Sequence, residues 1–348
     1  MNKRIISVLA ALLVAAGFTA CKDSKKKEEK KLSIVTTIFP EYDWVMSILG
    51  ENKDDAEVTM LLDNGVDLHS YQPTAEDILK ITTCNMFVYV GGESDEWVDD
   101  VLKQATNKDM VVIDLLDVLG DSVKEEEVVE GMEHEHDHDH EHEHEEGEEH
   151  DHDEEHDHDE KHDHEHEEPE YDEHVWLSLR HAQVICRKIE SELEKLNPDH
   201  KEAYKKNLDA YISELQNLDT EYKDVVEQSS CKTILFADRF PFRYFADDYG
   251  LTYYAAFTGC SAESEASFET IAFLSEKVDE LDLPAVLTIE NAKHKIAETV
   301  LENSSGKERK ILVMDSLQST TSEDLRNGKT YLSVMKSNLD VLKEALGA

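Results

Sequence analysis

Short apolar runs alternate with helical patterns along most of this chain, in two separate sets. Runs such as LSIVTTI (32–38) and KTILFA (232–237) are short, rich in apolar and β-branched residues and free of acidic residues, which is typical of strands buried on both faces of a parallel sheet. The expected strands are 32–38, 57–62, 86–92 and 110–116 in the first set, and 232–237, 252–257, 285–290 and 310–315 in the second. The sequence therefore predicts an α/β fold of two (β/α) lobes, residues 32–124 and 231–348.

The segment between the two sets, residues 173–230, has a helical pattern. Asn197 can cap a helix and Pro198 suits its first position. Apolar residues then recur every three or four positions, which places them on one face: Tyr204, Leu208, Tyr211, Leu215, Leu218, Tyr222 and Val225. About 30 helical residues would span about 45 Å. We expect one long rigid helix that joins the lobes, packs against both and restricts wide hinge closure.

A segment of different composition, residues 125–172, interrupts the chain after the first lobe. Its central 36 residues, 133–168, comprise 13 histidines, 21 acidic residues, one glycine and one lysine. Because such a stretch has no apolar surface to bury, it is expected to be a disordered insert. A solvated acidic spacer would explain the charge but not the histidines.

The histidines of the insert predict auxiliary metal binding, because imidazole favours zinc, copper, nickel and iron over calcium and magnesium. The expected auxiliary ligands are His134, His136, His138, His140, His142, His144, His150, His152, His156, His158, His162, His164 and His166. Their binding should weaken as the pH falls through about 6.5, where imidazole protonates. The strings HEHDH and HEHEH match the H-E-x-x-H protease motif, but alternation alone produces that match, so it does not indicate an enzyme.

The amino terminus predicts an extracytoplasmic location. Residues 1–21 have a basic start, an apolar run and small residues before Cys21, as in a secretory signal peptide. The layout resembles a bacterial lipoprotein signal, in which Cys21 would carry the lipid and 22–31 would form a polar tether. A plain secreted protein is the alternative. We expect the chain to be anchored at the outer face of the cytoplasmic membrane, in the periplasm or at the cell surface.

Charge and cysteine content narrow the classes of partner. The formal net charge of −45 makes the chain a poor candidate for nucleic-acid binding, which needs clustered Lys and Arg. It suits cationic partners, including metal ions. The cysteines Cys84, Cys186, Cys231 and Cys260 match no C-x-x-C spacing. Cys84 is expected to be an inert core residue. Whether Cys231 and Cys260 pair is left open by the sequence.

Three potential metal ligands lie in segments that should face a ligand crevice. Functional loops of α/β lobes follow the carboxyl ends of the strands. His69 follows the second strand, Asp315 ends the last strand, and His174 stands just beyond the insert. Two imidazoles and a carboxylate make a plausible site for Zn²⁺ or Mn²⁺.

Several motifs carry a resemblance that covers nearly the whole chain: IVTTIFPEYDWV, LLDNGVDLHSYQPT, MFVYVGG, DEHVWLS, FRYFADDYGL and CSAESEAS. They resemble the metal-specific substrate-binding lipoproteins of bacterial ABC transporters (cluster A-I), in particular the zinc-uptake branch. The resemblance implies one metal ion between two lobes, with His69 and His174 as ligands and Asp315 at a carboxylate ligand position. It also implies a monomer that works with a permease and its ATPase.

One position departs from that family pattern. The family's third ligand, a histidine or glutamate, falls on Arg239, whose guanidinium has no acceptor for a cation. Asp238 is the obvious substitute ligand, although it could instead pair with Arg239. The insert could also supply a nitrogen, and His294 is a weaker candidate.

The function predicted is high-affinity capture of Zn²⁺ between the lobes and delivery to an ABC permease for import. If Asp238 and Asp315 both bind, the site would shift toward Mn²⁺ or Fe²⁺. A surface metallohydrolase using Glu173 or Glu263 as base has no supporting reaction motif, so the chain is not expected to be an enzyme. A surface zinc buffer or adhesin acting through the insert is the remaining alternative.

Overall fold

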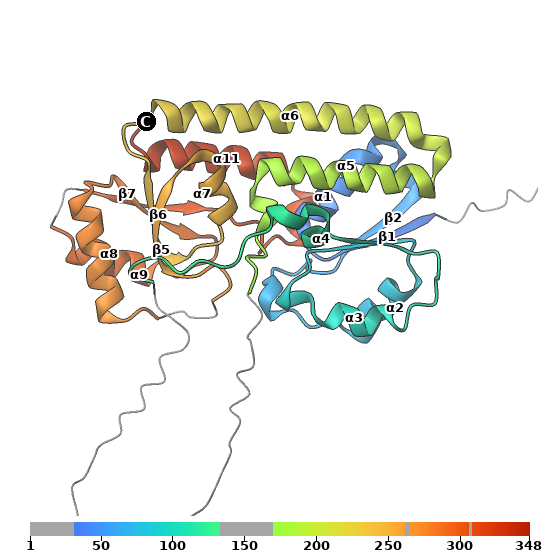
Figure 1. Ribbon diagram of the computed structural model, residues 1–348, viewed down its shortest axis with the longest axis horizontal. Coiled ribbons are helices and arrows are strands. Elements are labelled where there is room, and N and C mark those ends of the chain that lie inside the picture. Colours follow the sequence, from blue (N-terminus) through green and yellow to red (C-terminus); the bar gives the residue numbers. More distant parts are fainter. Residues whose placement is uncertain (1–30, 133–169, 262–264, 306–307) are drawn as a thin grey trace, which may run out of the picture. The chain divides into compact units, whose positions relative to one another are not determined.

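The computed structural model describes residues 31–132, 170–261, 265–305 and 308–348 (Figure 1). The chain divides into two units, Met1–Lys31 and Leu32–Ala348, and the second unit contains both lobes. Cys21, the 13 histidines of the insert and Glu263 lie outside the described residues. Within the described residues, no helix is long and apolar enough to cross a membrane.

The first lobe is a four-stranded, all-parallel sheet with strand order β2-β1-β3-β4. Its elements are β1 (Leu32–Thr36), α1 (Phe39–Leu49), β2 (Ala56–Met60), α2 (Ala75–Thr83), β3 (Met86–Tyr89), α3 (Trp97–Leu102), β4 (Val111–Asp114) and α4 (Leu115–Leu119). Apolar residues of β1 and β3 are fully buried, among them Ile34 and Phe87. Burial of continuous apolar strands is what the sequence pattern predicts.

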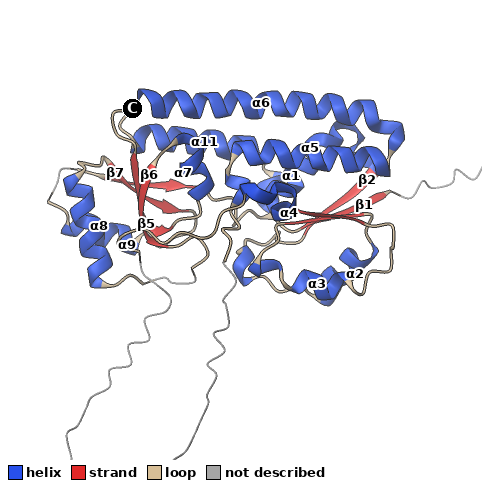
Figure 2. Ribbon diagram, in the orientation of Figure 1, coloured by secondary structure: helices blue, strands red, loops and turns tan. Residues whose placement is uncertain are grey.

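The second lobe repeats this topology with strand order β6-β5-β7-β8, again all parallel. Figure 2 draws its strands in red and labels β5, β6 and β7. Its elements are β5 (Thr233–Arg239), α7 (Arg243–Tyr249), β6 (Thr252–Phe257), α8 (Phe268–Glu280), β7 (Ala285–Ile289), α9 (Lys295–Asn303), β8 (Lys310–Met314), α10 (Ser322–Arg326) and α11 (Tyr331–Ala345). The predicted fold class, two (β/α) lobes with parallel sheets, is confirmed.

Two helices lie between the lobes in the sequence, α5 (Leu179–Leu196) and α6 (Lys201–Gln228). They pack side by side, and α6 also contacts α1 of the first lobe and α7 and α11 of the second (Figure 1). Its buried face includes Tyr204, Leu215 and Tyr222, as the spacing predicts. The 28 residues of α6 span about 42 Å at 1.5 Å per residue, so one stiff element braces both lobes.

Buried contacts also join the lobes directly. The backbone N–H of Tyr331, at the start of α11, donates to the Asp43 carboxylate on α1 at 3.1 Å. The rings of Trp44 and Tyr331 meet edge to face at 5.3 Å, and the Tyr331 hydroxyl donates to the Trp176 carbonyl at 2.7 Å. These contacts fix α1 of the first lobe against the start of α11 in the second lobe.

Two details differ from the sequence expectation. The strand expected at 110–116 ends at Asp114, because that side chain accepts the Asp117 N–H and starts α4. The ends of the predicted insert are part of the folded structure. Glu126 N–H donates to Glu170 O at 2.8 Å, and Asp172 N–H donates to Lys124 O at 2.9 Å. This antiparallel pairing fixes the chain two residues before His174.

Candidate metal centre

His69 stands in the loop that follows β2, within a short 3-10 turn, Leu68–Ser70. The turn begins at Asp67, whose carboxylate accepts the His69 backbone N–H at 3.1 Å. Only 14% of the His69 side chain is exposed. The loop thus directs an imidazole into a largely buried space at the carboxyl end of the first sheet, as expected for a functional loop.

His174 is fully buried and precedes a second 3-10 turn, Val175–Leu177. The paired ends of the insert fix its backbone from one side. From the other side Trp176 anchors the turn, since its indole N–H donates to the Ser316 carbonyl at 2.9 Å. The His174 and Trp176 rings lie 5.1 Å apart.

The two imidazoles face each other through their Nε2 atoms, which are 3.3 Å apart. Each Nδ1 atom has its own partner behind the ring. His174 Nδ1 lies 2.9 Å from the Asp172 carboxylate, and His69 Nδ1 lies 2.7 Å from Ser94 Oγ and 3.5 Å from Glu173 Oε2. When each Nδ1 carries the proton and donates it to its partner, the two Nε2 lone pairs are directed at each other. Carboxylates placed behind imidazoles in this way orient metal-binding histidines.

The protonation state of His69 suits metal binding. Burial lowers its pKa to about 4, and the neighbouring His174 adds to this effect. His69 is therefore neutral at pH 7, the form in which imidazole is a ligand. Burial also raises the pKa of Glu173 above its usual value.

The spacing of the nitrogens matches a tetrahedral transition-metal site. Zinc–nitrogen bonds of about 2.0–2.1 Å at a tetrahedral angle place two ligand nitrogens about 3.3–3.4 Å apart. The observed separation is 3.3 Å. An ion between these two lone pairs would need no large movement of either ring.

The Cys260 thiol is a third potential ligand that the sequence reasoning missed. Among the described residues, His69, His174 and Cys260 form a group whose ligand atoms all lie within 4.8 Å of one another. One signal pointed to Cys260: it follows β6, the second strand of its lobe, as His69 follows β2. The described cysteines form no disulfide, so Cys231 and Cys260 are not paired.

The two carboxylates predicted as ligands are not part of this group. Asp315 accepts from Lys329 Nζ at 2.9 Å and from the Leu317 N–H at 2.8 Å. Asp238 accepts the backbone N–H groups of Arg239 and Ile289 at 2.9 and 3.3 Å. Both side chains are bound to local partners in this structure, and neither joins the imidazole pair.

Arg239, at the position where the family pattern places a ligand, points to a carboxylate instead. Its Nη2 lies 2.7 Å from Asp67 Oδ2. The Arg239 side chain therefore forms its ion pair with Asp67, whereas Asp238 accepts only the Arg239 backbone N–H. His294, the weaker candidate, contacts Thr288 Oγ1 through Nδ1 at 3.0 Å and is not in the group either.

Gln318 is a further neighbour of the pair that the sequence analysis did not single out. It is buried. With its amide nitrogen toward Asp67, at 2.9 and 3.0 Å from the two carboxylate oxygens, its amide oxygen lies 2.9 Å from His174 Nε2. In this orientation the amide oxygen accepts a hydrogen bond from His174 Nε2, so in the absence of a metal ion Gln318 is the partner of that nitrogen.

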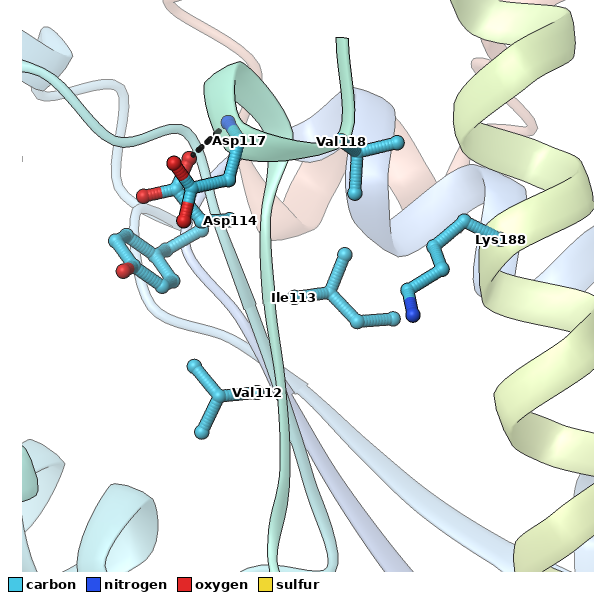
Figure 3. A pocket seen from close by; sticks show the side chains of 7 residues that line it. Val112, Ile113, Asp114, Asp117, Val118 and Lys188 are labelled. Carbon is cyan, nitrogen blue, oxygen red and sulfur yellow. Dashed lines mark hydrogen bonds between the residues drawn. The ribbon is translucent and has the colours of Figure 1, made fainter. Parts of the chain in front are cut away.

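A separate hollow lies along the outer strand of the first sheet (Figure 3). It is lined by Tyr89, Val112, Ile113, Asp114, Asp117, Val118 and Lys188. None of the potential ligands lines it, so it is not the candidate site.

Two similar lobes around a pair of buried imidazole nitrogens define a two-lobed metal-binding protein. A family model described as zinc-uptake complex component A, periplasmic, matches residues 34–345. The chain belongs to this family of zinc-uptake transporter components. That assignment confirms the resemblance carried by the sequence motifs, and it sets aside the metallohydrolase alternative, because the family is not one of enzymes.

Named relatives agree with the assignment. The zinc-binding lipoprotein AdcA of Streptococcus pneumoniae R6 is 33% identical over 339 residues, 97% of this chain and 60% of AdcA. The high-affinity zinc uptake system protein ZnuA of Bacillus subtilis is 30% identical, over 98% of this chain and 96% of ZnuA. The chain thus spans about 60% of the length of the streptococcal relatives.

A solved structure supports the fold. The zinc-bound ZnuA-like domain of Streptococcus pneumoniae AdcA superposes with a TM-score of 0.66 at 29% identity. The superposition covers 91% of this chain and all of that domain.

Proposed function

We propose that this protein captures Zn²⁺ outside the cytoplasmic membrane, in the space between His69 and His174. The observation that carries the proposal is the separation of 3.3 Å between the Nε2 atoms of largely buried His69 and fully buried His174, each ring having a polar partner at its Nδ1 atom. That spacing suits tetrahedral zinc. The related ZnuA-like domain of AdcA is described as zinc-bound, which supports the same cargo here.

The proposed destination of the ion is an ABC transporter permease with its ATPase. Membership of a zinc-uptake family supports this role. Attachment to the outer face of the membrane through a lipid on Cys21 is the proposed location, supported by the signal-like amino terminus and by the lipoprotein name of AdcA. We further propose that the protein works as a monomer and that the histidines of residues 133–168 add weaker, auxiliary zinc sites.

Zinc is favoured over manganese as cargo by the chemistry of the groups that face the pair. A manganese-like site would need carboxylates, yet Asp238 and Asp315 are bound to backbone N–H groups and to Lys329. Among the described residues, the group of potential ligands that contains the two imidazoles includes no carboxylate, and such a group suits zinc better.

The test is a competitive zinc titration of residues 22–348, with and without residues 133–168. We expect one tightly held zinc ion in both proteins and additional weaker ions only in the longer one. If the shorter protein holds no tight zinc, the tract itself does the binding and the protein is a surface zinc buffer.

A further inference from the structure

We propose that Cys260 is a ligand of the captured zinc, so that the site consists of two imidazole nitrogens and one thiolate. This inference rests on the proposed function, zinc capture between His69 and His174. It supplies a third ligand for the ion, which is needed because Arg239 stands at the position of the family's third ligand and cannot bind a cation.

The first argument is geometric. The Cys260 sulfur and one nitrogen of each imidazole lie within 4.8 Å of one another. In a tetrahedral site with bonds of about 2.3 Å to sulfur and about 2.0–2.1 Å to nitrogen, sulfur and nitrogen stand about 3.6 Å apart. Each sulfur–nitrogen separation, at most 4.8 Å, therefore exceeds the separation around a bound ion by no more than about 1.2 Å.

The second argument is the glycine that precedes this cysteine. A Cβ atom added at Gly259 would lie 3.0 Å from His174 Cε1 and Nδ1, and 3.0 Å from the Phe240 carbonyl oxygen. Any side chain at this position would press on the His174 ring. The absence of one lets the loop after β6 lie against the ring and brings the next residue, Cys260, to the imidazole pair.

The loop is also held from both sides of the cysteine. The Cys260 backbone N–H donates to Glu126 Oε1 at 3.0 Å, and Arg239 Nη1 donates to the Ser261 carbonyl at 3.4 Å. Arg239 thus contacts Asp67 on the His69 side and Ser261 on the cysteine side. The arginine that cannot bind a cation itself braces the loop that carries the substitute ligand.

The chemistry of binding balances without a further reactant. Zinc replaces the proton of the Cys260 thiol, the sulfur keeps the electron pair and forms the zinc–sulfur bond, and the proton leaves to solvent. Two histidines and a cysteine leave a fourth position for water or another oxygen ligand. Thiolate is a soft ligand that binds zinc far better than manganese, so Cys260 would set the selectivity of the site.

The experiment uses residues 22–348, which lack Cys21, with Cys260→Ser as the variant and Cys231→Ser as the matched control. Cobalt(II) is the probe, because a thiolate ligand gives a near-ultraviolet charge-transfer band that histidines of the insert do not give. We expect the band in the unsubstituted protein and in Cys231→Ser, and its loss in Cys260→Ser. We also expect Cys260→Ser to weaken zinc binding more than the roughly 10–100-fold cost of losing a group that only orients a ligand.

Cys260→Ser should leave manganese binding nearly unchanged, so the preference for zinc over manganese should fall. Gly259→Ala is a second variant that keeps the thiol but displaces the loop, and it should weaken zinc binding and diminish the band. Unfolding temperatures of the metal-free proteins check that each variant is folded.

The outcomes separate the two proposals. Tight zinc binding that is equal in the unsubstituted protein and in Cys260→Ser, with no charge-transfer band, would overturn the role of Cys260 and leave zinc capture intact. Failure of the unsubstituted protein to bind one zinc tightly would overturn zinc capture itself. A band that persists in Cys260→Ser would assign the thiolate to another cysteine and also reject the proposal.

Discussion

The two lobes share one strand order but use their strand ends differently. In the first lobe, the loop after the second strand, β2, presents His69. In the second lobe, the loop after the corresponding strand, β6, presents Cys260. Because both strands are parallel to their neighbours, these loops stand at the carboxyl edges of their sheets. The same topology therefore places one potential ligand from each lobe beside His174.

The other strand ends of the second lobe carry carboxylates that serve the fold. Glu290, after β7, accepts the backbone N–H groups of Ser316 and Gln318 at 2.6 and 3.2 Å. Asp238 and Asp315 are likewise bound to nearby N–H groups. A carboxylate with such partners stabilises a loop, and using it as a metal ligand would leave those donors unsatisfied. The topology of the lobe thus determines that potential ligands lie at the carboxyl edge of the sheet. Local hydrogen bonds then determine which of these side chains are available to bind a metal ion.

Removing an imidazole should have the largest effect on the site. We expect His69→Ala or His174→Ala to weaken zinc binding by more than the roughly 10–100-fold cost of losing an orienting group, because each removes a proposed direct ligand. His200→Ala is the control, since that ring is 30% exposed and pairs with Asp55. Competitive titration of the protein lacking 133–168 measures the effect. Unchanged affinity in either variant would remove that histidine from the site.

Removing the polar partners of the two Nδ1 atoms, Asp172 and Ser94, should have a smaller effect on zinc affinity. The loss should be larger for the partner of His174 than for the partner of His69. Asp172→Asn keeps the shape but removes the charge behind His174, and it should weaken zinc binding by about 10–100-fold. Ser94→Ala should cost less, because Glu173 Oε2, 3.5 Å from His69 Nδ1, remains as an acceptor. The same titration measures both variants. Equal losses would show that the carboxylate at Asp172 has no special part in orienting His174.

Much of the fold follows from the apolar pattern, because strands that are buried on both faces must be apolar along their length. The face of α6 with Tyr204, Leu215 and Tyr222 follows from its spacing for the same reason. The short helix α4 was missed because its start depends on one hydrogen bond, from the Asp117 N–H to Asp114. Residue identity alone does not show which partner a polar side chain takes.

The candidate site was only partly predictable, because residue identity does not show which partner a side chain takes in the folded protein. His69 and His174 stand in loops whose positions follow from the strands and the motifs. A lone cysteine has no spacing pattern, and the approach of Cys260 depends on Gly259 lying against the His174 ring. Asp315 stands at a strand end as expected, but Lys329, which is 14 residues further along the chain, binds it.

Substituting Asp315 or Asp238 should have the smallest effect on zinc affinity. That result would support the view that the carboxylates at the strand ends of the second lobe stabilise its loops and do not bind the metal ion. Asp315→Asn and Asp238→Asn should change zinc affinity by less than about threefold, below the lower limit for losing a group that orients a ligand. Asp315→Asn should lower the free energy of unfolding by at most about 1 kcal/mol, because its pair with Lys329 is partly exposed. Zinc titration and chemical denaturation of the metal-free protein measure the two quantities. A large loss of zinc affinity in Asp315→Asn would mean that Asp315 leaves Lys329 to bind the ion, and the second lobe would then supply a carboxylate as the family resemblance implies.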